Sequence, residues 1–228
     1  VEEQRDSESF LAQDLRSFVR LLDILAQDYD VMLMNPPYGS KGRMPTRVQN
    51  YVEDKYQYYP NYYVSFFEVC NRLSKRDGRI GMLVPRTFMF LSSYESFRGD
   101  IIGEEGGFDF LAEFGNGVLD NATVHTAATV IRSSEKQQQG SFFRLYDLPG
   151  RKKESAFVDV ISDVDLNKKR RFDVDLSTFA EIPRTPICYS TPASVRDLYD
   201  TDVLLDAEHA GVDAKSKFTA IPGLQTSN

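Results

Sequence analysis

The stretch Asn35-Pro36-Pro37-Tyr38 constrains the chain more than any other. It directly follows residues 31–34, an unbroken apolar run that is typical of a strand covered on both faces in a parallel sheet. Ligands of open α/β sheets bind beyond the carboxyl ends of the strands, so Asn35 is well placed to contact one. The prolines stiffen the loop and remove N–H donors, which leaves the Asn35 side-chain oxygen and the Pro36 carbonyl as acceptors beside the Tyr38 ring. Such a group suits a planar ligand with an exocyclic amino group, for example adenine.

This stretch resembles the Asn/Asp-Pro-Pro-Tyr/Phe motif of S-adenosylmethionine-dependent amino methyltransferases, above all the DNA adenine-N6 enzymes. The resemblance implies that Asn35, Pro36, Pro37 and Tyr38 are the catalytic residues. Asn35 and the Pro36 carbonyl would hold the N6 amino group, and Tyr38 would stack on an adenine flipped out of the duplex. It also implies that Asn35 and Pro36 contact the cofactor. The alternative is a strand that ends in a proline-rich turn without catalytic role.

The elements around the motif alternate between helix and strand. Apolar residues at steps of three and four predict a helix over residues 10–25. Residues 61–78 have a helical pattern closed by a glycine, and residues 79–84 have the pattern of a second buried strand, parallel to the first. Ser92 and Glu95 have the spacing of a capping box that starts another helix.

Three further segments, at residues 108–114, 124–131 and 142–146, have the pattern of strands. The first two flank the loop 115–123 and are expected to form an antiparallel edge that closes the sheet. Together with the resemblance, this order predicts an α/β fold. It corresponds to the C-terminal part of a Rossmann-like class I methyltransferase sheet, followed by the start of a target-recognition region.

Shifts in composition divide the chain into four parts: a lead-in helix at 1–29, the methyltransferase part at 30–148, a charged linker or excursion at 149–175, and the start of a target-recognition region at 176–228. In the last part, an Ile-Pro-x-x-Pro-Ile-x-Tyr segment at 182–189 is followed by a short predicted helix and by Gly-Leu-Gln-Thr at 223–226. This tail resembles the region after the catalytic domain in BREX phage-exclusion adenine methyltransferases and in type IIG-like (Eco57I-like) restriction-modification enzymes.

The charge pattern bears on DNA binding. A net charge of −7 argues against a protein that coats DNA, since phosphate neutralisation needs cations. Lys41, Arg43 and Arg47 nevertheless follow the motif directly and are candidates for DNA contact, although such clusters are more often solvated surfaces. The glycines at 39 and 42 suggest a mobile flap over the site, followed by a tyrosine-rich stretch that either packs or stacks on bases.

The loop between the segments 108–114 and 124–131 contains one more candidate. In several related enzymes an aromatic residue at the position of Leu119 helps to hold the flipped adenine, so Leu119 is assigned to substrate binding although leucine departs from the pattern. His125 is read as a strand residue rather than a catalytic base. His125 and His209 are too few to build a zinc site alone, and Cys70 and Cys188 have no metal or redox spacing.

The cofactor half of such an enzyme belongs before the central strand, where a glycine-rich loop and a following acidic residue hold S-adenosylmethionine. Residues 1–29 contain no glycine. Because the chain also starts at Val1 rather than Met, we expect a fragment that begins near the motif, depends on the full-length protein for S-adenosylmethionine, and has little or no activity alone.

The expected function is site-specific DNA adenine-N6 methylation in a restriction-modification or phage-defence system. The expected partners are double-stranded DNA with a flipped adenine and other defence-system subunits. The chain has no apolar run of membrane-spanning length and no signal peptide, so a cytoplasmic location is expected. Two alternatives stay open: an amino methyltransferase that acts on protein glutamine or RNA, and a non-catalytic module that binds DNA or a partner.

Overall fold

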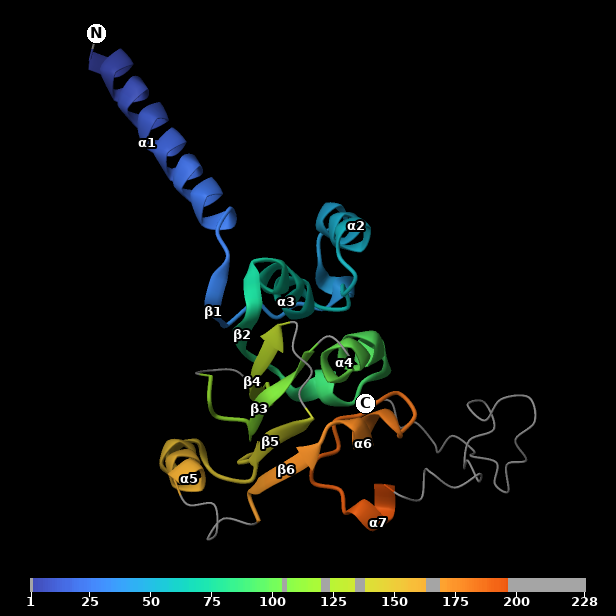
Figure 1. The fold of residues 1–228 in the computed structure, drawn as a ribbon. Helices are drawn as coiled ribbons and strands as arrows, with labels where there is room; N and C mark the ends of the chain where they lie inside the picture. The colour runs from blue at the N-terminus through green and yellow to red at the C-terminus, as the bar shows by residue number, and fades with distance from the viewer. Residues whose placement is uncertain (1, 104–105, 120–123, 134–137, 163–168, 197–228) are drawn as a thin grey trace, which may run out of the picture.

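A computed structural model describes residues 2–103, 106–119, 124–133, 138–162 and 169–196 (Figure 1). The helices are α1 Glu2–Leu25, α2 Thr46–Lys55, α3 Tyr62–Arg72, α4 Glu95–Ile102, α5 Gly150–Ser162, α6 Ser177–Ala180 and α7 Ala193–Arg196. The strands are β1 Tyr29–Met34, β2 Ser74–Pro85, β3 Gly106–Gly115, β4 Thr126–Ser133, β5 Gln139–Arg144 and β6 Arg171–Asp175. Short 3-10 helices are η1 Lys41–Arg43, η2 Arg86–Met89 and η3 Ser92–Tyr94.

The strands form one sheet in the order β1-β2-β4-β3-β5-β6. The pairs β1–β2 and β3–β5 are parallel, and β2–β4, β3–β4 and β5–β6 are antiparallel. The carboxyl ends of β1, β2, β3 and β5 therefore lie together with the amino end of β4. We call this side of the sheet the carboxyl edge.

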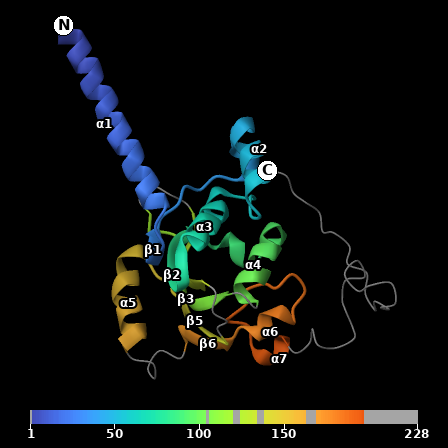
Figure 2. The ribbon, with the colours of Figure 1, turned by 45° about the horizontal axis from the view of Figure 1, so that its top comes forward.

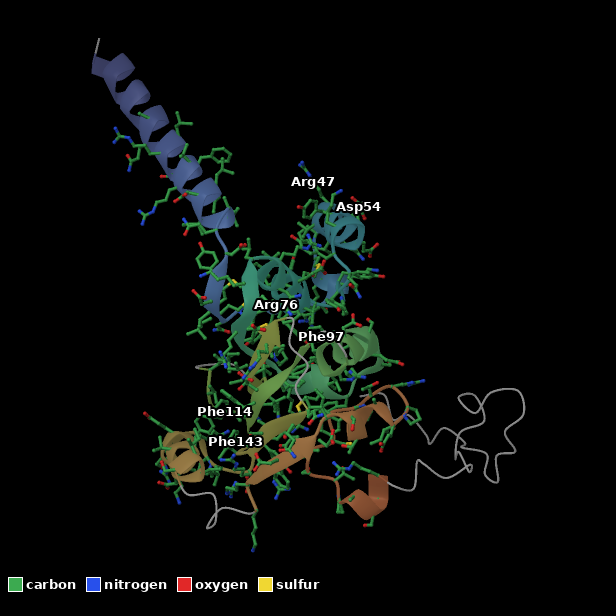
Figure 3. All side chains as sticks on the ribbon, in the orientation of Figure 1. Arg47, Asp54, Arg76, Phe97, Phe114 and Phe143 are labelled. Atoms are coloured by element: carbon green, nitrogen blue, oxygen red, sulfur yellow. The ribbon has the colours of Figure 1, made fainter. Side chains whose placement is uncertain are left out.

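Helices cover the two faces unequally (Figures 1 and 2). On one face α3 contacts β2, α4 contacts β3 and α6 contacts β6, and the main core lies beneath them. On the other face α5 covers β3 and β5 through a smaller cluster that includes Phe157 and Val160. Side chains alternate between the two, since Phe142 belongs to the main core and its neighbour Phe143 to the α5 cluster. Figure 3 shows Phe143 beside α5 and Phe97 on α4.

The prediction that residues 31–34 are covered on both faces is wrong. β1 is an edge strand, and its side chains Val31 and Leu33 are 57% and 80% exposed. The cause is that the described helices near β1 cover only the face of the main core, whereas α5 lies at β3 and β5. An apolar run thus identified the strand correctly but not its surroundings.

Helix α1 forms as the apolar periodicity predicts, but it projects away from the sheet (Figure 1). Its exposed apolar side chains are Leu15, Phe18, Val19, Leu21, Leu22, Ile24 and Leu25. Within the described chain, no helix combines the length and apolar character that crossing a membrane requires.

The segments 108–114 and 124–131 do form an antiparallel hairpin, but this hairpin is not the edge of the sheet. β5 and β6 extend the sheet beyond it. Residues 149–175 differ from a linker, because they contain α5 and β6 with buried apolar residues such as Val160 and Val174. The domain boundaries at 148 and 175 themselves stay predictions.

Residues 176–189 are part of the main core. Phe179 and Ile187 are buried, and the Tyr189 ring stacks on Phe142 with centroids 5.1 Å apart and planes 7° from parallel. The target-recognition region from 176 onward stays a prediction, and residues 197–228, with the Gly-Leu-Gln-Thr segment, lie outside the described residues.

Two predicted helix boundaries are displaced. Helix α4 begins at Glu95 without a side-chain cap, because η3 occupies the residues from Ser92 onward. Helix α3 ends at Arg72, so Gly78 lies within β2. The C-cap of the helix is instead Leu73, whose φ is −92°, rather than a glycine.

Candidate functional site

Asn35 and Tyr38 meet at the carboxyl end of β1. The Tyr38 hydroxyl donates to the Leu83 carbonyl of β2 at 2.9 Å and lies 3.1 Å from the Asn35 side-chain oxygen, so one proton serves two acceptors. Burial raises the pKa of Tyr38, which keeps this hydroxyl protonated at neutral pH. Pro36 is buried and Asn35 is exposed. The arrangement holds the Asn35 amide at the surface in a fixed position relative to the tyrosine ring.

The loop after Tyr38 is anchored to the start of α3. The Gly39 N–H donates to the Asn61 side chain at 3.0 Å, the Tyr62 N–H donates to the Gly39 carbonyl at 3.1 Å, and the Lys41 N–H donates to the Pro60 carbonyl at 3.0 Å. A Cβ at Gly39 would come within 2.7 Å of the Tyr62 ring. The prediction of a mobile flap is therefore wrong for this part, because three hydrogen bonds and a close ring contact fix it.

The three predicted DNA-binding cations have different surroundings. Lys41 is ion-paired with Glu53, and its ammonium lies 4.9 Å from the centre of the Tyr59 ring. The hydrogen bond to Glu53 raises the pKa of Lys41. Arg43 and Arg47 are exposed, and Arg47 lies at the outer side of α2 (Figure 3). A phosphate would have to compete with Glu53 for Lys41, and DNA contact by the three residues stays a prediction.

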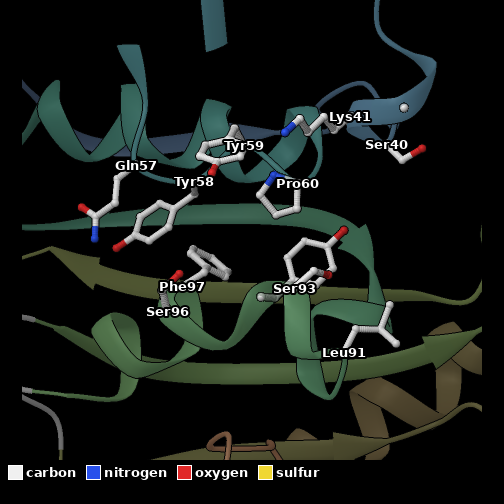
Figure 4. Close-up of a pocket in the computed structure, with 12 residues that line it drawn as sticks. Ser40, Lys41, Gln57, Tyr58, Tyr59, Pro60, Leu91, Ser93, Ser96 and Phe97 are labelled. Carbon is white, nitrogen blue, oxygen red and sulfur yellow. The ribbon is translucent and has the colours of Figure 1, made fainter. Parts of the chain in front are cut away.

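A cavity of about 530 Å³ lies beside this loop (Figure 4). Ser40, Lys41 and Tyr59 line it on one side, and Ser93 and Ser96 line it on the other. Two members of the tyrosine-rich stretch, Tyr58 and Tyr59, line this cavity, whereas Tyr63 is fully buried in the main core. Packing therefore explains Tyr63, and base stacking by the other tyrosines stays a prediction.

Leu119 is half-buried and follows β3 at the carboxyl edge, the same side of the sheet as Asn35. Residues 120–123 of its loop lie outside the described residues. The buried ammonium of Lys153, on α5, donates to the carbonyls of Phe114 and Asn116 just before Leu119. Helix α5 thus ties down the turn that carries this wall of the predicted base pocket.

We expect Lys153→Met to weaken methylation by changing this turn. The substitution leaves two carbonyls without their donor, at about 1–3 kcal/mol each when buried, but it also removes a buried charge, which offsets part of that cost. The expected result is a higher KM for DNA with a smaller loss of thermal stability. Steady-state kinetics of the full-length protein measure it, with Lys152→Met at the exposed neighbouring position as the control. Equal kinetics for the two variants would remove Lys153 from this role.

A second cluster of polar side chains lies at the carboxyl edge, and no sequence motif predicts it. The Arg86 guanidinium and the Tyr189 hydroxyl each donate to one carboxylate oxygen of Glu113, which is 4% exposed. Burial, and then the hydrogen bond to Glu113, raise the pKa of Tyr189. These residues come from η2, β3 and the segment after α6, so only the fold brings them together. His125 precedes β4, and its carbonyl accepts a hydrogen bond from the backbone N–H of Arg86 at 2.9 Å.

The residues on the open face of the sheet beside Asn35 can be compared with the chemical groups of S-adenosylmethionine. A hollow of about 410 Å³ there is lined mainly by apolar residues, among them Leu33, Leu83 and Val130, and also by Asn35. Such a wall suits an apolar or aromatic surface, but it offers no charged partner for a ribose, an amino or a carboxylate group. The described residues therefore do not form a complete site for this cofactor, and no step is derived through it.

Two relatives match more than three quarters of this chain. The chain is 28% identical over 185 residues to the adenine-specific methyltransferase PglX of Lacticaseibacillus casei (strain Zhang), which covers 77% of this chain and 15% of that protein. It is 29% identical over 185 residues to the adenine-specific methyltransferase BrxX of Escherichia coli O9:H4 (strain HS), which covers 78% of this chain and 14% of that protein. The chain thus spans about a seventh of the length of these relatives.

Solved structures share the fold. The methyltransferase subunit of a type I restriction-modification system from Streptococcus thermophilus superposes with a TM-score of 0.53 at 14% identity, covering 70% of this chain and 38% of that one. A nuclease-deletion mutant of the type ISP restriction-modification enzyme LlaGI, in complex with a DNA substrate mimic, gives 0.51 at 13% identity, covering 74% and 16%. Residues 2–116, half of the chain, match the Eco57I restriction-modification methylase family. The chain belongs to that family.

Proposed function

We propose that this chain is the base-binding part of a site-specific DNA adenine-N6 methyltransferase. The observation that supports this most is the Asn35–Tyr38 arrangement, in which the Tyr38 hydroxyl bridges Asn35 and the Leu83 carbonyl at the carboxyl end of a parallel strand. A fixed acceptor beside an aromatic ring fits an adenine whose amino group is held while its ring is stacked. The two relatives named above are both adenine-specific methyltransferases.

The chemistry requires position more than a base. The lone pair of the adenine N6 is delocalised into the ring, so the nitrogen becomes a nucleophile only when its amino group turns pyramidal. The Asn35 oxygen and the Pro36 carbonyl accept the two N6 hydrogens in that geometry and stabilise the positive charge that develops on the nitrogen. S-adenosylmethionine supplies the methyl group when it is bound. Stacking on Tyr38 offsets part of the cost of flipping the adenine.

The proposed partners are double-stranded DNA, which would approach the carboxyl edge, and other subunits of a restriction-modification or phage-defence system. The first is supported by the LlaGI structure, which contains a DNA substrate mimic. The second is supported by the Streptococcus thermophilus structure, which is one subunit of its system.

Product analysis of the full-length protein tests the proposed function. The protein is incubated with isotope-labelled S-adenosylmethionine and with duplex DNA, RNA or cell protein, and the products are identified by mass spectrometry. We expect N6-methyladenine in DNA alone. Label in glutamine or in RNA would support the other amino methyltransferases, and no label in any substrate would support a non-catalytic binding module.

Tyr38→Phe separates the role of the hydroxyl from that of the ring. The variant keeps the stacking surface but loses the hydrogen bonds to Asn35 and Leu83. Because one hydrogen bond contributes about 0.5–1.5 kcal/mol, we expect kcat to fall about 2- to 10-fold while the KM for DNA changes little. Steady-state methylation kinetics measure both. A rise in KM with an unchanged kcat would contradict the idea that the hydroxyl positions Asn35.

A further inference from the structure

A guanidinium lies against two exposed aromatic rings at the carboxyl edge. The Arg86 guanidinium carbon is 5.2 Å from the centre of the Phe90 ring and 5.5 Å from the centre of the Tyr146 ring. Phe90 is 45% exposed and Tyr146 is 43% exposed, although each carries a large apolar surface. We call these three residues the Phe90–Arg86–Tyr146 platform. Arg86 contacts both rings, and the Arg144 guanidinium carbon also lies 6.0 Å from the centre of the Tyr146 ring, while nearly half of each aromatic residue stays exposed.

A cavity of about 260 Å³ opens at this platform and reaches Glu113 and Ser190. This volume is below the range of about 300–1,000 Å³ that drug-sized ligands occupy, so it fits one heterocycle rather than a dinucleotide. The Arg86 charge is neutralised by the Glu113 carboxylate, which is itself buried. A phosphate or carboxylate ligand would place a second anion beside Glu113, whereas a neutral ring with donors and acceptors would not.

The platform is separate from the Asn35–Tyr38 loop. Asn35 follows β1, and Glu113 lies on β3, three strand positions away in the sheet. Neighbouring strands are about 4.8 Å apart, so Glu113 lies about 14 Å from β1 along this edge, whereas Arg86 and Phe90 follow β2, the strand beside β1. The cavity at the platform includes neither Asn35 nor Tyr38, and a DNA duplex that lies along this edge can reach both places.

We propose that the Phe90–Arg86–Tyr146 platform binds a second, unpaired base of the DNA. This inference rests on the proposed function, because flipping the adenine leaves other bases without their stacking or pairing partners. Two bases have the required chemistry: the base left opposite the adenine, and the base next to the adenine in the same strand. Stacking on the aromatic rings retains either base outside the helix, and the Arg86–Glu113 pair offers it donors and acceptors.

The test compares three duplexes that carry the methylation site of the full-length protein: an intact duplex, one with an abasic site opposite the target adenine, and one with an abasic site next to it. Their dissociation constants are measured for the wild-type protein and for Phe90→Ala/Tyr146→Ala. Base stacking on an aromatic ring contributes about 1–3 kcal/mol, so we expect the variant to bind the intact duplex about 5- to 150-fold more weakly. It should lose no affinity for the duplex that lacks the base the platform binds.

The pattern across the duplexes identifies the base. If the variant binds every duplex more weakly than the wild type does, except the duplex that is abasic opposite the adenine, the platform binds the opposite base. If the exception is the duplex that is abasic next to the adenine, the platform binds the neighbouring base. Equal loss on all three duplexes, or no loss on any, would overturn the proposal. Methylation of the intact duplex by the wild-type protein is scored in parallel, so a failure of the proposed function is seen separately.

Two further variants keep the result interpretable. Phe90→Leu/Tyr146→Leu retains apolar side chains without ring faces and should reproduce the loss seen with alanine. Phe66→Ala removes a ring of similar exposure, 44%, from α3 and should bind all three duplexes like the wild type. Normal affinity of the leucine variant for the intact duplex would show that apolar contact, and not stacking, is what the platform provides, and would also overturn the proposal.

Discussion

Asn35→Ala in the full-length protein is expected to lower kcat for adenine methylation about 100- to 1,000-fold. The substitution removes an acceptor aimed at the charge that develops on N6, and loss of one such preorganised group has an effect of that size in other enzymes. Folding should be unchanged, because Asn35 is exposed and its described side-chain contact is the one with the Tyr38 hydroxyl, which keeps its second acceptor at Leu83. Transfer of a labelled methyl group to DNA measures the effect.

The matched control is Asn50→Ala, which removes the same side chain from an exposed position on α2. It should retain the kcat of the wild type. Binding of the Asn35→Ala variant to DNA is measured in addition, because a residue that acts in the transition state affects kcat more than affinity. If Asn35→Ala retains more than half of the wild-type kcat, the assignment of the catalytic residues is wrong.

Arg98→Met is expected to cause the largest loss of stability. The Arg98 side chain is fully buried, and its guanidinium donates to four carbonyls, those of Phe88, Leu91, Arg184 and Thr185, at 2.6–2.9 Å. Arg184 and Thr185 both have positive φ, at 68° and 49°, so the guanidinium holds an unfavourable backbone turn. Methionine leaves all four carbonyls without this donor, and we expect the free energy of unfolding to fall by about 3–5 kcal/mol.

Urea denaturation measures this change. Arg98→Lys should fall between the wild type and Arg98→Met, because an ammonium has three donors for four carbonyls. Arg72→Met is the control, since Arg72 is 59% exposed and its ion pair with Glu68 is expected to contribute less than about 1 kcal/mol. Equal losses for Arg98→Met and Arg72→Met would contradict the role of Arg98 in fixing the segment 182–189.

Local patterns predicted the central part of the fold. The apolar runs before Asn35 and before Pro85 correctly indicated two parallel strands, and the helix between them follows from its periodicity. The family and the α/β class followed from the same residues. What local patterns could not show was burial: residues 31–34 have the composition of a covered strand, but coverage depends on elements far away in the sequence.

Local patterns also failed to predict α5 and β6, for a related reason. Residues 149–175 are dominated by charge, and the apolar side chains that pack, such as Phe157, Val160 and Val174, are few and spread over two elements. Each of them is buried by a partner on another strand or helix. A charged segment with sparse apolar residues therefore has the composition of a linker although it forms α5 and β6.

The candidate site was predictable only as far as it is local. Asn35 and Tyr38 are three residues apart and could be assigned from their motif, but the bond from Tyr38 to Leu83 and the anchoring of Gly39 by Asn61 join distant residues. Arg86, Glu113 and Tyr189 are separated by 27 and 76 residues. No spacing rule connects them, and the Phe90–Arg86–Tyr146 platform came only from the fold.

The most direct test of the proposed site is the position of the target adenine in a structure of the full-length protein bound to its DNA. The predicted result is an adenine outside the helix, stacked on Tyr38, with N6 at hydrogen-bond distance of about 2.7–3.2 Å from both the Asn35 side-chain oxygen and the Pro36 carbonyl oxygen. An adenine that stays in the helix, or one whose N6 is bound by other residues, would contradict the assignment of Asn35, Pro36 and Tyr38.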